Sequence, residues 1–88
     1  MTEFTIEEVK RVYEQHKYMN EEKVVSRGHA ERALAIIEWA KGEYTKNDII
    51  QSADLNSHMV IHPSREDGYP WGMIVNTLEA IINEMTVS

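Results

Sequence analysis

Histidine and carboxylate side chains are the residues of this sequence whose types and spacing suit a metal ion. His58 and His62 are four positions apart, a spacing that on a helix places two imidazoles on one face. Pro63 follows His62 and ends any helix there. No glutamate lies between His58 and His62, so they do not form the His-Glu-x-x-His motif of zinc proteases. Glu66 or Asp67 would be the nearest third ligand. The spacing does not decide whether His58 and His62 bind a metal, and we assign no metal ligand and no cofactor.

No pattern in the sequence matches acid–base or nucleophilic catalysis. The adjacent pairs Glu7–Glu8 and Glu21–Glu22 point apart on a helix, which is typical of a solvated face. The sequence has no cysteine and no nucleophile elbow. Its four glycines stand singly, so no glycine-rich loop is present to hold a phosphate. We therefore expect a protein that is not an enzyme.

The segment Gly68–Gly72 is the most unusual stretch, because two aromatic residues flank a proline. Exposed rings in such a setting act as rigid anchors at protein interfaces. We interpret Trp71 as the first core residue of the last helix and Tyr69 as a surface residue. The predicted binding site combines Tyr69 with the charged residues that precede it, namely Arg65, Glu66 and Asp67.

One short stretch resembles a known family. Residues 63–77, which end in Tyr-Pro-Trp-Gly-Met-Ile-Val-Asn-Thr, are similar to the last loop and helix start of the all-helical colicin nuclease immunity proteins. Those proteins are small, acidic four-helix inhibitors of DNase toxins, so the resemblance implies a protein inhibitor. Residues 57–63 lack the paired tyrosines with which that family grips its nuclease.

Composition and charge narrow the class of protein. The chain has 88 residues, 42% of them hydrophobic and 27% charged, which indicates one small globular domain over residues 1–88. No apolar run approaches the roughly 20 residues that span a bilayer, and no signal peptide is visible, so we expect a cytoplasmic protein with no membrane contact. The net charge of −6 opposes nucleic-acid binding. Residues 45–88 hold six acids and two bases, which suits a basic protein partner.

Apolar residues recur at spacings of three and four in four stretches, which predicts helices at about residues 6–19, 29–41, 46–55 and 70–86. Residues 20–28 are predicted as a turn and residues 56–69 as a long loop. The predicted fold is all-α, a small four-helix bundle with a long loop before the last helix.

Capping patterns mark the predicted helix ends. Thr5 and Thr45 each begin a Thr-x-x-acid pattern, which predicts that both are helix N-caps. Phe4 and Val9 stand at the positions of a hydrophobic staple. Gly42 is predicted to end the second helix in a left-handed conformation.

These features favour a small acidic, non-enzymatic interaction module of the inhibitor, immunity or antitoxin kind, or a phage or mobile-element accessory protein, that binds and blocks a partner protein. The alternative is an oligomeric protein that holds a nucleotide-like ligand between basic and aromatic residues of the first half, namely Arg11, Lys17, Tyr18, Arg27 and Arg32. We also expect a homodimer or larger assembly, because the predicted second and last helices have wide apolar faces.

Overall fold

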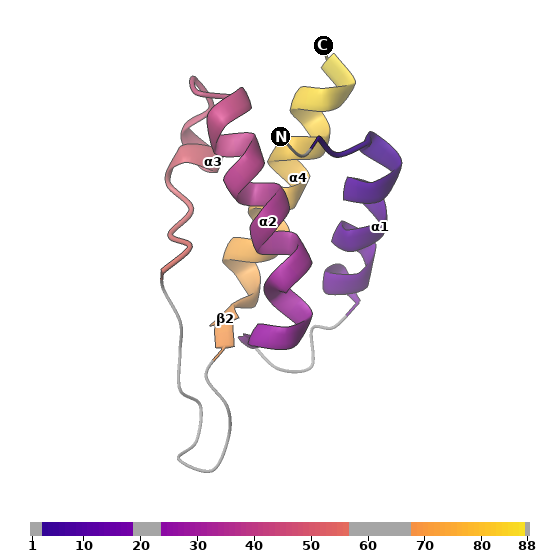
Figure 1. Ribbon diagram of the computed structural model, residues 1–88, viewed down its shortest axis with the longest axis vertical. Coiled ribbons are helices and arrows are strands. Elements are labelled where there is room, and N and C mark those ends of the chain that lie inside the picture. Colours follow the sequence, from indigo (N-terminus) through magenta and orange to yellow (C-terminus); the bar gives the residue numbers. More distant parts are fainter. Residues whose placement is uncertain (1–2, 19–23, 57–67, 88) are drawn as a thin grey trace.

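The computed structural model describes residues 3–18, 24–56 and 68–87. These residues form four helices and two short strands (Figure 1). In chain order the elements are α1 (Ile6–Lys17), β1 (Val24–Ser26), α2 (Arg27–Glu43), α3 (Asp48–Gln51), β2 (Gly68–Pro70) and α4 (Trp71–Val87). The prediction of a mainly helical protein is confirmed. A regular four-helix bundle stays a prediction, since α3 has only four residues.

The long helices α1, α2 and α4 pack around a common core, and α3 contacts both α2 and α4 (Figure 1). Most of the predicted apolar stripes point inward, as amphipathic helices require. The fully buried large side chains are Val9, Val25, Ile36, Ile37, Ile50, Ile74, Leu78 and Ile81. Within the described ranges no helix is both long and apolar enough to cross a membrane.

The start of α1 follows the predicted pattern in part. The Thr5 hydroxyl accepts a hydrogen bond from the Glu8 amide at 3.2 Å, so Thr5 is the N-cap as predicted. The Glu8 carboxylate does not reach back to complete the capping box and pairs instead with Arg32 of α2. Phe4 is buried and packs edge-to-face on Trp39, with ring centroids 5.6 Å apart. The ion pair and the ring contact therefore tie α1 to α2.

The second helix is longer than predicted at both ends. It begins at Arg27, so Gly28 lies in its first turn. The preceding residue, Ser26, is extended, and its hydroxyl hydrogen-bonds His29 Nδ1 at 3.0 Å. The prediction of a left-handed Gly42 is wrong, because the helix continues to Glu43 and no described glycine has a positive φ.

The prediction that Thr45 caps the third helix is also wrong. The N-cap is Asn47, whose side chain accepts from the Ile50 amide at 3.1 Å. Thr45 lies instead in a turn, in which the backbone N–H of Asn47 donates a hydrogen bond to the Tyr44 carbonyl. The side chain of Gln51 then donates to carbonyls at the end of α2, which holds α3 against that helix end.

A two-stranded antiparallel sheet replaces part of the predicted turn at 20–28. Strand β1 pairs with β2, and the register sets Val25 opposite Tyr69. Val25 is almost fully buried, so the pair belongs to the core rather than to a loop. Each strand has three residues, too few for the alternation that identifies a strand in a sequence.

The last helix matches its prediction closely. It runs from Trp71 to Val87, and Pro70 stands just before it as the last residue of β2. Trp71 is half-buried, packs against the core and donates its indole N–H to the His16 carbonyl of α1. The interpretation of Trp71 as a core residue is thus confirmed.

Candidate functional site

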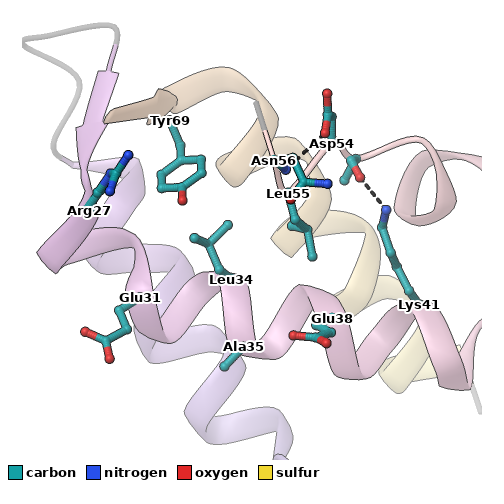
Figure 2. Close-up of a pocket in the computed structure, with 11 residues that line it drawn as sticks. Arg27, Glu31, Leu34, Ala35, Glu38, Lys41, Asp54, Leu55, Asn56 and Tyr69 are labelled. Atoms are coloured by element: carbon teal, nitrogen blue, oxygen red, sulfur yellow. Dashed lines mark hydrogen bonds between the residues drawn. The ribbon is translucent and has the colours of Figure 1, made fainter. Parts of the chain in front are cut away.

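A hollow of about 690 Å³ lies on the described surface as a groove between α2, residues 53–56 and β2 (Figure 2). We call it the Tyr69 groove. It is lined by Arg27, Glu31, Leu34, Ala35, Glu38, Lys41, Ala53, Asp54, Leu55, Asn56 and Tyr69.

Tyr69 differs from its prediction as a free surface residue. It is half-buried, lies in β2 and packs against the hydrophobic core. Its pairing with β1 orients the side chain, so that the ring forms one wall of the groove and points toward Leu34 (Figure 2). The residue lines the groove, and its role in binding stays a prediction.

The other predicted site residues, Arg65, Glu66 and Asp67, lie outside the described residues, as do His58 and His62. Their grouping with Tyr69 stays a prediction. In the part of the chain that the structure describes, no group of three histidine or acidic residues is arranged to hold a metal ion.

The floor of the Tyr69 groove is apolar and its outer edge is acidic. Leu34 and Leu55 are half-buried and face each other beside the tyrosine ring (Figure 2). Glu31 and Glu38 are exposed, stand two turns apart on α2 and have no cationic partner among the described residues. The groove thus offers apolar contact next to exposed carboxylates, and Arg27 and Lys41 also belong to its lining.

Two hydrogen bonds hold residues 53–56 in place at the edge of the groove. The Lys41 ammonium donates a hydrogen bond to the Ala53 carbonyl, and the Asp54 carboxylate accepts one from the backbone N–H of Asn56 at 3.0 Å (Figure 2). The latter is the local turn that aspartate favours. Lys41 is therefore engaged by the backbone, and no ion pair between it and a carboxylate of α2 is present among the described residues.

Sequence reasoning missed most of the groove. Its apolar floor joins Leu34, Leu55 and Tyr69 from three separate elements, and no local pattern links them. The one available signal was the wide apolar face of the predicted second helix, which the sequence interpretation used as evidence for self-association.

The basic residues of the first half do not meet in one hollow. Arg32 is held by Glu8 and lies over the Phe4 ring, 4.8 Å from its centroid. Lys17 lies 5.6 Å from the centroid of Tyr13 on its own helix, and Tyr18 is 77% exposed. Among the described residues, Arg32 contacts α1 and the segment before it, whereas Lys17 contacts its own helix, so these contacts do not bring the two basic residues together.

His16 is a buried titratable group outside any of the described hollows. It is 2% exposed, and neither ring nitrogen has a hydrogen-bond partner among the described residues. Burial, assisted by the positive charge that His29 can carry, lowers the pKa of His16 below its ordinary value of 6.5. The imidazole is therefore neutral at pH 7 and acts as a core side chain.

Comparison with known proteins supplies no family, since no family model, curated protein or solved structure matches the chain. The resemblance to the immunity proteins therefore depends on residues 63–77 alone.

Proposed function

We propose that this protein is a small acidic, non-enzymatic interaction protein that binds, and thereby blocks or adapts, a partner protein. The supporting observation is the build of the Tyr69 groove, in which an apolar floor adjoins exposed carboxylates. Buried apolar anchors with a charged rim are the usual anatomy of a protein interface. A cytoplasmic location is part of the proposal.

The groove favours a particular kind of partner segment. Leu34, Leu55 and Tyr69 would contact an apolar side chain, for which half-buried walls are already in place. Glu31 and Glu38 would face basic side chains, because both are exposed at the groove and neither forms an ion pair among the described residues. The proposed occupant is therefore a segment of another protein that carries an apolar anchor between basic residues.

Ala35 offers a test because it is exposed and lines the groove. Ala35→Arg should block the groove and abolish recovery of the partner from cells that produce the protein. Gln15→Arg is the matched control, since it adds the same side chain to an exposed position of α1.

Both variants should keep the melting temperature of the natural protein, because exposed helix substitutions change stability by only a few tenths of a kcal/mol. Mass spectrometry of the recovered material should show one protein retained by the natural sequence and by Gln15→Arg and lost with Ala35→Arg. Equal recovery with all three proteins would exclude the Tyr69 groove as the binding site.

The predicted loop residues form a separate part of the proposal. Replacing Arg65, Glu66 and Asp67 together by alanine should weaken recovery of the same partner without changing the melting temperature. If this triple variant binds fully, the loop connects elements and does not contact the partner.

Small-molecule binding is the second candidate. The volume of the Tyr69 groove, about 690 Å³, lies within the range of roughly 300–1,000 Å³ typical of ligand pockets. Native mass spectrometry of the protein from its own cells separates the candidates. A retained mass increment of ligand size would favour the small molecule, and a second polypeptide would favour the interaction protein.

A further inference from the structure

A second groove runs between α3 and α4. It has a volume of about 460 Å³ and shares no lining residue with the Tyr69 groove. We call it the α3–α4 groove. Its lining residues are Asn47, Ile49, Asn76, Glu79, Ala80, Asn83, Glu84 and Val87.

Exposed apolar side chains gather at this groove. Among the described residues, three large hydrophobic side chains are exposed: Tyr18, Ile49 and Val87. Two of them line the α3–α4 groove, Ile49 at 56% exposure from α3 and Val87 at 84% from α4. Single exposed apolar residues are ordinary, but two on facing elements of one groove provide a site where a partner would remove apolar surface from water.

The charge of the groove is negative and uncompensated. The Glu79 carboxylate accepts a hydrogen bond from the Tyr13 hydroxyl at 3.0 Å, and the Glu84 carboxylate accepts one from the Asn47 amide at 2.9 Å. Both donors are neutral, so they orient the two carboxylates without cancelling their charge. None of the described residues that line the groove is basic.

The phenol of Tyr44 responds to the same negative charge. Burial, together with the carboxylates of Glu43 and Glu84, raises the pKa of Tyr44 above its usual value of 10.0. The Tyr69 groove is lined by Arg27 and Lys41 as well as by carboxylates, whereas no described residue that lines the α3–α4 groove is an arginine or a lysine. Charge complementarity therefore specifies a basic occupant.

The length and direction of the groove suit a helix. Along α4 its lining residues include Asn76, Ala80, Asn83 and Val87, at intervals of three and four, so they share one face. From Asn76 to Val87 that face extends about 16 Å, which matches roughly three turns of a second helix. Helices commonly bind in grooves between two helices by means of apolar residues at such spacings.

We infer that the α3–α4 groove binds a basic amphipathic helix of another protein. The apolar face of that helix contacts Ile49 and Val87, and its lysine or arginine side chains pair with Glu79 and Glu84. The inference does not depend on the Tyr69 groove, because the residues that carry it are different.

A synthetic peptide of about fourteen residues, four helical turns, tests the inference. It contains only leucine and lysine, arranged so that a helix has one leucine face and one lysine face. A second peptide of identical composition has leucine and lysine in strict alternation, a pattern that a helix cannot separate into two faces. The first peptide should shift the backbone amide NMR signals of Ile49, Ala80, Asn83 and Val87 and bind at least fivefold more tightly than the second.

Three double variants identify the contacts. Glu79→Gln with Glu84→Gln should weaken binding roughly fivefold, because each rim ion pair contributes modestly. Ile49→Ser with Val87→Ser should weaken it by at least as much. The matched control is Glu7→Gln with Glu14→Gln, which removes the same charge from an exposed face of α1 and should change affinity by less than twofold.

Several results would overturn the inference. Signal shifts on other elements would place the peptide elsewhere. Equal binding of the alternating peptide, or equal weakening by the control variant, would mean that only net charge attracts the peptide. Self-association of the protein that Ile49→Ser and Val87→Ser abolish would assign the groove to a second copy of this chain. None of these results bears on the Tyr69 groove, because partner recovery with Ala35→Arg tests that groove separately.

Discussion

His16 is the side chain whose environment is least expected from its chemistry. It occupies a core position of α1 with neither nitrogen hydrogen-bonded among the described residues. Charging the ring in that position is costly, because burial removes water from the cation. Folding therefore holds the imidazole neutral, which links the stability of the protein to pH.

We expect the free energy of unfolding to fall as the pH drops below about 6.5. The unfolded chain binds the proton at its ordinary pKa, whereas the folded chain binds it only at lower pH, so acid favours unfolding. The loss contributed by this residue has a limiting slope of about 1.4 kcal/mol per pH unit. Denaturant titrations from pH 7 to pH 5 measure it.

His16→Leu should remove this contribution and should be as stable as the natural protein at pH 7, because it replaces two unpartnered buried polar atoms by apolar surface. The Trp71 hydrogen bond survives, since it uses the backbone carbonyl. His29→Gln is the control and should keep most of the pH dependence, because burial is the larger cause of the lowered pKa. An unchanged pH dependence in His16→Leu would contradict this account.

Among the elements, helix starts are set by contacts beyond the capping pattern. Thr5 caps α1 through its hydroxyl, and its helix is then held by the Glu8–Arg32 ion pair. At α3 the similar pattern beginning at Thr45 is bypassed, since Asn47 makes the cap and also donates to Glu84 of α4. The tertiary contact explains why the later residue is used.

Alanine substitutions distinguish these two helix starts. Thr5→Ala should lower the free energy of unfolding by about 1 kcal/mol, the usual loss on removing a capping side chain. Thr45→Ala should change it by less than about 0.5 kcal/mol, as expected for an exposed turn residue. Urea denaturation monitored by circular dichroism measures both. Equal losses in the two variants would restore Thr45 as a cap.

The strand pair contributes to the core through Val25, which lies opposite Tyr69 and is 1% exposed. Val25→Ala should cost about 2 kcal/mol, since it removes two buried methyl groups and leaves a cavity. Val87→Ala makes the same chemical change at a position that is 84% exposed and should cost almost nothing. A similar melting temperature for both variants would mean that β1 does not pack into the core.

For the molecule as a whole, the net charge of −6 should accelerate association with a basic partner. The association rate with the leucine–lysine helical peptide should fall steeply between about 0.01 M and about 0.15 M salt, as the screening length shortens from about 30 Å to about 8 Å. Dissociation should change much less, because it depends on the contacts within the groove. Stopped-flow fluorescence of a labelled peptide separates the two rates.

Self-association also belongs to this scale and stays a prediction. The wide apolar faces that suggested it pack within the chain, where α2 and α4 contact each other and α4 contacts α1. The exposed apolar residues that remain in the described part are Tyr18, Ile49 and Val87. Sedimentation at micromolar concentration should show a homodimer or larger species, and a monomer would contradict this prediction.

The sequence by itself determined the features that depend on neighbours three or four positions apart. The periodic stripes identified α1, α2 and α4 within a few residues, and the Thr5 cap and the core position of Trp71 followed from the same local patterns. Helical hydrogen bonds and side-chain contacts are short in sequence, so a single stretch contains the information that places them.

Only the tertiary structure decided the strand pair, the cap of α3 and the two grooves. Val25 and Tyr69 are far apart in the chain, and their pairing depends on how α2 and α4 pack. The Tyr69 groove likewise needs Leu34 and Leu55 to meet the tyrosine ring, and the α3–α4 groove needs Ile49 to face Val87. Such long-range contacts depend on the burial of whole helix faces, which no short stretch of sequence specifies.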